Sequence, residues 1–272
     1  MYYKRQLEQT INKIEKMFGA VLISGSRQVG KTTLLREMKP GTTYLTLDDP
    51  ILLNSAIEDT GAFFKATPPP VIVDEVQYAP NLFPYIKMIL DENKKKGQFF
   101  LTGSQQFKMM KNVSETLVGR MGILTLMGLS LREINRLEFN LPFLPSSDYL
   151  ANRKKNLVAN DYNQIWQIIH RGSMPAMHIE PVMDWQAFYA AYTKTYIERD
   201  VRDLTQVGDG NRFIKFMTAI ASRTGQLLNQ AAVSRDVGVS QPTVERWLSI
   251  LQASSLIYML QPFHNNLISL CV

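Results

Sequence analysis

The sequence predicts an α/β fold in which helices cover both faces of a mostly parallel sheet. Short apolar runs of strand type alternate with helical patterns in the first half of the chain, as in sheets with crossover helices. One run leads into a glycine loop that ends in a lysine and two threonines, and another ends in two carboxylates. Open α/β sheets bind ligands beyond the carboxyl ends of their strands. The sequence therefore predicts a polar site at that edge of the sheet.

The strand-type runs are short and mostly apolar, as expected of strands that are buried on both faces. The first is AVLIS, which is followed by the helical stretch TLLREM and closed by Pro40-Gly41. The five predicted strands are residues 20–24, 43–47, 71–77, 98–104 and 122–127.

A longer helix is predicted between the third and fourth strands. Asn81 is its predicted N-cap and Gly97 its predicted C-terminal cap. The lysine run 94–96 then falls in the last turn, where cations complement the helix dipole, so it does not indicate a nucleic-acid patch. The apolar residues at helical spacing are Leu82, Tyr85, Ile86, Ile89 and Leu90.

The segment GSRQVGKTT, residues 25–33, fits the pattern G-x-x-x-x-G-K-[ST] between a strand and a helix. Gly25 and Gly30 let the backbone curl so that its N–H groups face a concavity that holds phosphate oxygens. Lys31 would reach the terminal phosphates and Thr32 would bind Mg²⁺. Arg27 either contacts phosphate or is solvated. The predicted phosphate-binding residues are Gly25, Ser26, Arg27, Gln28, Val29, Gly30, Lys31, Thr32 and Thr33.

Asp74 and Glu75 end the third strand-type run. Asp74 would hold Mg²⁺ directly or through water, and Glu75 would orient and deprotonate an attacking water. Turns are polar, so an isolated Asp-Glu pair after a strand would indicate little. Its combination with the glycine loop predicts phosphoryl chemistry.

Several motifs carry a resemblance to a known family: GSRQVGKTTLL, YLTLDDP, VIVDEVQYAPNLFPYIK, GQFFLTGSQQF, LVGRMGILTLMGLSLREI, RGSMPAM and YIERDV. In them the sequence resembles bacterial and archaeal AAA-superfamily ATPases whose P-loop core precedes a C-terminal domain of unknown function. The resemblance implies ATP as the nucleotide and a core of the additional-strand type, in which the strand after Asp74-Glu75 lies next to the loop strand. It also implies a polar sensor at the end of that inserted strand, where Thr102 and Ser104 match and Gln105 matches less well.

Arg120 precedes the fifth strand-type run and has two interpretations. An arginine finger, acting in the same chain or from a neighbouring subunit, would stabilise charge on the γ-phosphoryl oxygens and fits the resemblance. The alternative is a structural arginine that pairs with a carboxylate near the sheet edge. The sequence leaves both open.

The composition of the sequence changes beyond residue 135, where proline and polar residues become frequent. In the following helical part, aromatic residues recur at helical spacing in DWQAFYAAYTKTYIERDV and predict a core-facing stripe, and Glu198-Arg199-Asp200 either pair locally or couple domains. The predicted domains are an ATPase core at 1–135, a linker or crossover at 136–160, a helical domain at 161–222 and a winged-helix-like domain at 223–272.

The last fifty residues have the pattern of a helix-turn-helix. One helix would end near Asp236, turn at Val237-Gly238 and restart after Ser240 as N-cap, and SLIYML with LISL would form the wing. A DNA-reading interpretation would put Gln241, Thr243 and Arg246 in the major groove. From residue 221 onward, however, the sequence has three arginines and two carboxylates. The resulting net charge of +1 is low for a DNA-binding surface. Contact with a protein or with another domain is the alternative.

Composition limits the other classes of function. A net charge of +6 permits a polyanionic partner without establishing one, the single cysteine excludes an internal disulfide, and the three histidines lack metal-ligand spacing. The N-terminus has no signal-peptide core, and no apolar run approaches the roughly 20 residues that span a bilayer, so we expect a cytoplasmic location. Relatives usually continue past the wing, so the chain is expected to be naturally short or truncated at Cys271-Val272.

Two functional hypotheses follow. The first is Mg²⁺-dependent ATP binding and hydrolysis coupled to rearrangement of the C-terminal region. The second is a nucleotide-gated module that contacts DNA or protein with little turnover, since folds of this kind serve both roles.

Overall fold

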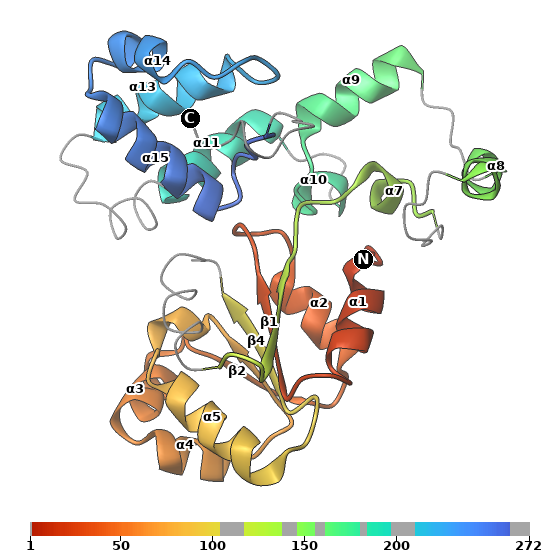
Figure 1. Ribbon diagram of the computed structural model, residues 1–272, viewed down its shortest axis with the longest axis vertical. Coiled ribbons are helices and arrows are strands. Elements are labelled where there is room, and N and C mark those ends of the chain that lie inside the picture. Colours follow the sequence, from red (N-terminus) through yellow and green to blue (C-terminus); the bar gives the residue numbers. More distant parts are fainter. Residues whose placement is uncertain are drawn as a thin grey trace, which may run out of the picture. The chain divides into compact units, whose positions relative to one another are not determined.

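The computed structural model describes residues 2–103, 117–137, 146–155, 161–179, 184–196 and 210–261 (Figure 1). The chain divides into two compact units, Met1–Thr195 and Tyr196–Val272, which are treated separately below. Within these ranges, no helix has both the length and the apolar character needed to cross a membrane.

A five-stranded parallel sheet forms the centre of the first unit (Figure 1). Its order is β2-β3-β4-β1-β5, so β4 lies between β1 and β3. This confirms that five strands form and that the strand after Asp74-Glu75 is inserted beside the loop strand. The third strand, however, ends at Asp74 rather than at residue 77, because a short 3-10 helix, Val76–Tyr78, follows it. The strands are β1 Ala20–Ser24, β2 Thr43–Thr46, β3 Val71–Asp74, β4 Phe99–Gly103 and β5 Met121–Thr125.

Helices cover both faces of this sheet (Figure 1). One face is covered by α3 Pro50–Glu58, α4 Thr60–Ala66 and α5 Leu82–Asn93, and the other by α1 Leu7–Ile14 and α2 Lys31–Met38. The strands feed both layers because successive side chains point to opposite faces. In β1, Ala20 and Leu22 join the core under α5, whereas Val21 and Ile23 join the core under α2.

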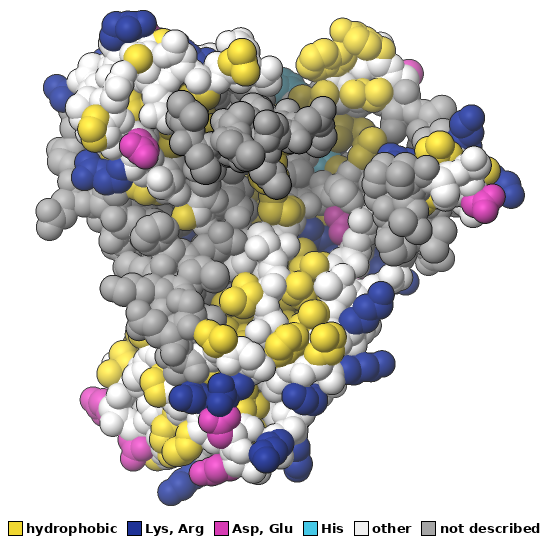
Figure 2. Space-filling view, in the orientation of Figure 1, with side chains coloured by type: hydrophobic (Ala, Val, Ile, Leu, Met, Phe, Trp, Pro, Cys, Tyr) yellow, Lys and Arg dark blue, Asp and Glu magenta, His cyan; other side chains and the backbone are white. Residues whose placement is uncertain are grey.

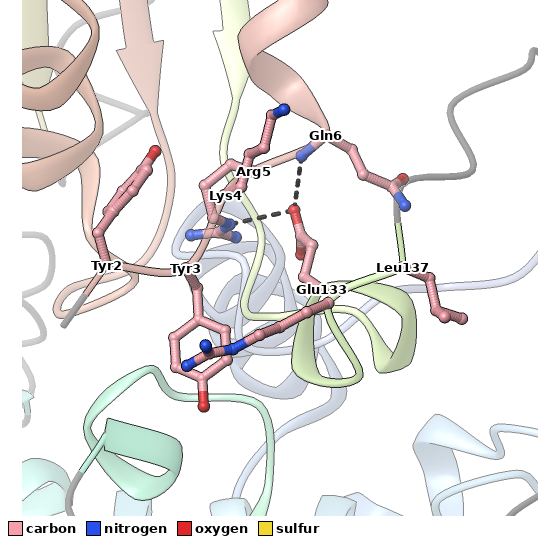
Figure 3. Close-up of a pocket in the computed structure, with 8 residues that line it drawn as sticks. Tyr2, Tyr3, Lys4, Arg5, Gln6, Glu133 and Leu137 are labelled. Carbon is pink, nitrogen blue, oxygen red and sulfur yellow. Dashed lines mark hydrogen bonds and ion pairs between the residues drawn. The ribbon is translucent and has the colours of Figure 1, made fainter. Parts of the chain in front are cut away.

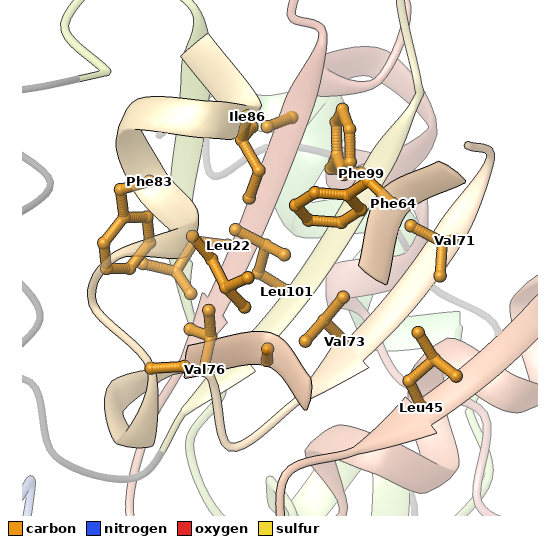
Figure 4. Close-up of a cluster of buried hydrophobic side chains, with 14 of the residues drawn as sticks. Leu22, Leu45, Phe64, Val71, Val73, Val76, Phe83, Ile86, Phe99 and Leu101 are labelled. Atoms are coloured by element: carbon orange, nitrogen blue, oxygen red, sulfur yellow. The ribbon is translucent and has the colours of Figure 1, made fainter. Parts of the chain in front are cut away.

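The core between the sheet and α3–α5 is built from buried apolar side chains (Figure 4). The Phe64 and Phe99 rings meet edge to face with their centroids 5.5 Å apart. Burial of one such side chain contributes roughly 1.5–3 kcal/mol. This layer therefore fixes the carboxyl ends of the strands, where the predicted site residues lie.

The ends of α5 differ from the prediction. Asn81 is the N-cap residue of α5, as predicted, but its side chain does not cap the helix, because its amide donates to Ala56 O and Thr60 Oγ1, both at 2.7 Å. The helix ends at Asn93, and Lys94 in a left-handed conformation is its C-cap residue. The lysine run therefore begins at the cap and continues beyond the helix, and Gly97 is not its terminator.

Further helices follow the sheet in the first unit. They are α7 Leu131–Ile134, α8 Ser147–Lys155, α9 Tyr162–Arg171, α10 Ala176–Ile179 and α11 Trp185–Tyr196. Helix α8 lies inside the predicted linker, so part of that segment is ordered. In α11, Tyr192 of the aromatic stripe is buried, as expected of a core-facing residue.

The face of α9 is apolar and open to solvent (Figure 2). Tyr162, Ile165, Trp166 and Ile169 are each at least 43% exposed. Asp161 and Gln164 form a capping box at the start of this helix, so its first turn is stabilised locally.

The second unit contains the predicted pair of helices. Its elements are α13 Gly210–Ala221, α14 Gln230–Val237 and α15 Gln241–Ala253. Gly238 ends α14 in a left-handed conformation and the Ser240 hydroxyl caps α15, as the sequence predicted. Trp247 packs on Phe213 and Phe216 with ring centroids 5.2 and 5.3 Å away, which ties α15 to α13.

The first strand predicted for the wing of the winged-helix-like domain is wrong, because residues 255–260 are a turn followed by irregular chain. The expected second strand and the Glu198-Arg199-Asp200 signature lie outside the described residues.

Candidate functional site

The glycine loop joins the carboxyl end of β1 to the first turn of α2. Gly25 has φ +140° and Gly30 has φ +90°, a region that favours glycine. A Cβ at Gly25 would lie 2.2 Å from the Leu126 carbonyl oxygen, so any side chain there would displace the loop or the segment after β5. Gln28 also has a left-handed backbone, with φ 62°. The loop thus has the curled backbone that the sequence predicted.

Lys31 lies at the start of α2 and is only 6% exposed. Its Nζ donates to the carbonyl oxygens of Gly25 and Ser26 at 3.1 and 2.9 Å. The ammonium group therefore lies against the first residues of the loop, close to the concavity that would hold phosphate.

Three hydroxyl groups converge on the Asp74 carboxylate at the end of β3. Thr32 Oγ1 donates to Oδ1 and Oδ2, both at 2.9 Å, and the Tyr44 hydroxyl donates to Oδ2 at 2.8 Å. The Thr102 hydroxyl, at the end of β4, donates to Oδ1. Thr32 and Asp74, predicted to share a metal ion, are thus direct neighbours.

The donor set around Asp74 suits Mg²⁺. A carboxylate and a hydroxyl are hard oxygen ligands, and Mg²⁺ in phosphoryl-transfer sites is bound by one or two protein groups together with substrate phosphates. Over the described part of the chain, no three His, Cys, Asp or Glu side chains gather as a separate metal site. Thr32 and Asp74 are therefore the residues that fit this ion.

Glu75 follows Asp74 in a left-handed backbone conformation, with φ 57°. Its backbone N–H donates to Thr102 Oγ1 at 3.3 Å, and Gln77 Nε2 donates to its carboxylate. Left-handed backbone in a non-glycine residue is strained and is frequent at active sites. Thr102 therefore links both acidic residues, and its role as a sensor stays a prediction. Ser104 and Gln105 lie outside the described residues.

Arg120 lies at the other end of the sheet. Its Nε and Nη2 atoms donate to the two carboxylate oxygens of Asp91 at 2.5 and 3.1 Å. Arg120 precedes β5, which runs parallel to β1, so about 13 Å of strand separates it from the loop edge. This geometry favours the structural interpretation within one chain. A role in a neighbouring subunit stays a prediction.

The remaining predicted loop residues differ in exposure. Val29 is buried in the core with α2, Ser26 is buried, and Gln28 and Thr33 are exposed. Arg27 is half-buried, and whether it contacts phosphate stays a prediction.

Tyr44 is a site residue that the sequence analysis missed. Burial, followed by the hydrogen bond and the charge of Asp74, raises its pKa to about 12. The Arg36 guanidinium lies 5.1 Å from its ring centroid. In the parallel pair of β2 and β3, Tyr44 is the partner of Ile72, and Ile72 shares a sheet face with Asp74. The order of the strands would have been needed to see this from the sequence.

The RGSMPAM motif lies beside the loop, which the sequence also did not reveal. Ser173 O accepts from Leu129 N at 2.7 Å, and Pro175 Cγ lies 4.0 Å from the place of a Cβ on Gly30. The motif therefore packs between the glycine loop and the segment that follows β5.

Comparison with known families divides the chain into two matched regions. Residues 18–135 match a family described as an AAA domain, and residues 162–270 match a domain of unknown function, DUF8612. The first region contains the glycine loop, Asp74 and Glu75. The second contains α9 and every described helix after it.

Comparison with individual proteins shows the fold of this chain and the length of its relatives. Uncharacterized proteins of Mycobacterium bovis and Mycobacterium tuberculosis are each 25% identical over 258 residues, which cover 91% of this chain and 51% of theirs. The chain thus spans about half the length of these curated relatives. The structure of a Walker-type ATPase of Pyrococcus abyssi is 15% identical, covers 93% of this chain and 90% of that chain, and has a TM-score of 0.58, which shows the fold. The chain therefore carries an AAA domain followed by a domain of unknown function, and its first unit has the fold of a P-loop ATPase.

Proposed function

We propose that this protein binds ATP with Mg²⁺ and hydrolyses it. The observation that carries the proposal is the meeting of Thr32, from the glycine loop, with Asp74, whose neighbour Glu75 is tied to Thr102. The residues of α2, β3 and β4 to which we assign phosphate and metal binding, the general base and the sensor thus meet at one edge of the sheet. The preference for ATP rests on the AAA domain match.

The residues have distinct roles in this reaction. The backbone N–H groups of the loop and Lys31 would bind the phosphates, and Thr32 and Asp74 would hold Mg²⁺, which neutralises charge on the β- and γ-phosphate oxygens when bound. Glu75 accepts a proton from water as the water oxygen bonds to the γ-phosphorus and the bond to the β-phosphate oxygen breaks. ADP and phosphate leave, and Thr102 holds Glu75 and Asp74 in register.

We further propose that hydrolysis is coupled to rearrangement of the C-terminal region. The position of Pro175 next to Gly30 and the hydrogen bond between Ser173 and Leu129 support this step, because they link the loop and the segment after β5 to residues beyond the ATPase core. A change in the conformation of the loop on nucleotide binding would therefore shift the RGSMPAM segment.

The test compares nucleotide binding and phosphate release in the wild type, Glu75→Gln and the control Glu92→Gln. Glu92 is an exposed carboxylate of α5. Loss of a general base lowers turnover by about 10²–10⁴-fold. We expect Glu75→Gln to lose turnover by at least about 100-fold while it binds ATP within about twofold of the wild type, and Glu92→Gln to behave as the wild type.

Two other results would contradict the proposal. A wild type that binds no nucleotide contradicts the whole proposal. Equal turnover in the wild type and Glu75→Gln contradicts the assignment of the base.

A nucleotide-gated module with little turnover is the second candidate, and the helix pair α14–α15 favours it. Gln241 and Arg246 are exposed on α15 after the Ser240 cap, where a recognition helix carries its base contacts. We propose DNA as the partner to test first and protein contact as the alternative. Fluorescence anisotropy of a labelled duplex, with and without ATP, should show binding that Arg246→Ala weakens and the control Arg212→Ala on α13 does not. Absence of binding in all samples rejects DNA.

A further inference from the structure

Arg5 is a buried arginine just before α1 that the proposed chemistry does not use. It is 5% exposed, and its guanidinium points toward Glu133 in a small cavity of about 170 Å³ (Figure 3). A buried cation is costly unless it is paired and hydrogen-bonded. Its contacts therefore indicate why the fold retains it.

Each nitrogen of the Arg5 guanidinium has a partner. Nη1 donates to the Val29 carbonyl oxygen at 2.8 Å, and Nη2 donates to the carbonyl oxygens of Met127 at 2.6 Å and Gly128 at 3.3 Å. Nε donates to Glu133 Oε1 at 3.1 Å. One planar group thus connects the glycine loop, the segment after β5 and α7.

Glu133 is fixed in its turn and balances the charge of Arg5. It is 8% exposed, and its carboxylate accepts from the backbone N–H groups of Gln6 and Ser130, both at 2.8 Å. Burial raises the pKa of this carboxyl, but the hydrogen bonds from Ser130 and Gln6 and the charge of Arg5 lower it more, so its pKa is lowered overall. The carboxylate is therefore a rigid, ionised support for the guanidinium.

The bond to Val29 has a consequence for the loop. The C=O and N–H groups of a planar trans peptide point in opposite directions. Because Arg5 binds the Val29 carbonyl, the N–H of Gly30, in the same peptide unit, points away from Arg5. The guanidinium lies close to this peptide, since Nη1 is 3.9 Å from the place of a Cβ on Gly30. The buried Val29 side chain limits rotation of the same unit.

We infer that Arg5 is a positioning residue for phosphate binding, which holds the Val29–Gly30 peptide so that the Gly30 N–H faces the phosphates. The inference rests on the proposed function in one respect: it assumes that the glycine loop binds phosphate. It requires no hydrolysis, so it can be tested on ADP. Lysine could not replace this arginine, because an ammonium group lacks the planar fork that reaches the loop, the segment after β5 and Glu133 together.

The experiment compares Arg5→Lys with the control Arg136→Lys. Arg136 lines the same cavity, but its guanidinium lies over the Tyr3 ring, 5.1 Å from the centroid. Two quantities are measured: the Kd for ADP by calorimetry, and hydrogen exchange of the peptide that covers residues 25–31 without nucleotide. The expected loss of one well-placed N–H contact, about 1–2 kcal/mol, weakens ADP binding by about 5–30-fold in Arg5→Lys. The control should stay within about twofold.

A kinetic measurement separates positioning from a general structural defect. In Arg5→Lys the KM for ATP should rise with the Kd while kcat stays within about twofold, because Glu75 and Thr102 are untouched. Exchange of residues 25–31 should become faster, with the melting temperature of the variant still well above the assay temperature.

Opposite results overturn the inference. Wild-type affinity for ADP together with unchanged exchange at residues 25–31 would leave Arg5 with a structural role only. If Arg5→Lys does not fold, Glu133→Gln gives the same test: the introduced amide accepts from Nε without charge, so the guanidinium is held less firmly and ADP binding should weaken by about two- to fourfold. Unchanged binding and exchange in that variant would overturn the inference as well. If the wild type binds ADP but does not hydrolyse ATP, that result contradicts only the proposed reaction and not the role of Arg5.

Discussion

Replacement of Tyr44 by phenylalanine tests the hydroxyl cluster at Asp74. The substitution removes one donor from the carboxylate and leaves the ring under Arg36. A hydrogen bond to a charged group contributes about 1.5–3 kcal/mol, and the half-buried position of Tyr44 places the expected loss near 1–2 kcal/mol. For a unit of this size the melting temperature should fall by about 2–8 °C at pH 7.5 without nucleotide.

The pH dependence of this loss follows from the tyrosine pKa. The pKa is raised to about 12 in the folded protein, so the contribution is fully present below the unfolded value of about 10 and is lost as the pH rises through 12. At pH 11, between the two pKa values, the wild type has lost part of this stabilisation, so the difference between wild type and Tyr44→Phe should be clearly smaller than at pH 7.5. Thermal unfolding of both proteins at pH 7.5 and pH 11 measures this.

Two results would refute the reasoning. One is a melting temperature of Tyr44→Phe equal to that of the wild type at pH 7.5. The other is a double-mutant cycle with Asp74→Ala in which the two losses simply add, because a hydroxyl that acts through Asp74 must lose its effect once that carboxylate is gone.

Three further predictions concern residues that the structure places in specific surroundings. Gly25→Ala should weaken ADP binding at least about tenfold, because the added Cβ would lie against the Leu126 carbonyl oxygen. Gly41→Ala, which has open space around the new Cβ, should leave the affinity for ADP unchanged. Equal affinities of the two variants for ADP would contradict this explanation. Arg120→Ala should break the exposed pair with Asp91 and leave ATP turnover intact at concentrations where the protein is monomeric, and a loss of turnover there would favour a role in the same chain. Because the pKa of Glu133 is lowered, its stabilising effect should be lost as the pH falls below about 4.5, and denaturant unfolding of Glu133→Gln should show a weaker decline over that range than the wild type.

Much of the sheet and loop could be predicted because local patterns determine them. The strand runs are continuous apolar segments, and the glycine loop has a fixed spacing, so neither depends on distant parts of the chain. The helix pair of the second unit was also predictable, since Gly238 and Ser240 supply the turn and the cap.

The contacts that connect distant segments could not be predicted in this way. Arg5 and Glu133 are 128 residues apart in the sequence, and the carboxylate lies in a capping box that alone would explain its presence. The same applies to Tyr44, whose pairing with Asp74 depends on which strand lies next to β3. Asn81 shows the reverse error, because a locally plausible cap was overridden by partners on α3 and α4.

The geometry of the Asp74 cluster also depends on the register of the strands. Its donors come from α2, β2 and β4, and Asp74 comes from β3, so the carboxylate is shared by three adjacent strands. A slip of one residue in any of these strands would turn the side chain to the opposite face of the sheet. Nucleotide affinity would then be lost although the content of secondary structure stayed the same. Refolded or redesigned versions of this domain can therefore be sorted by ADP binding, which reports correct alignment of the strands more directly than circular dichroism does.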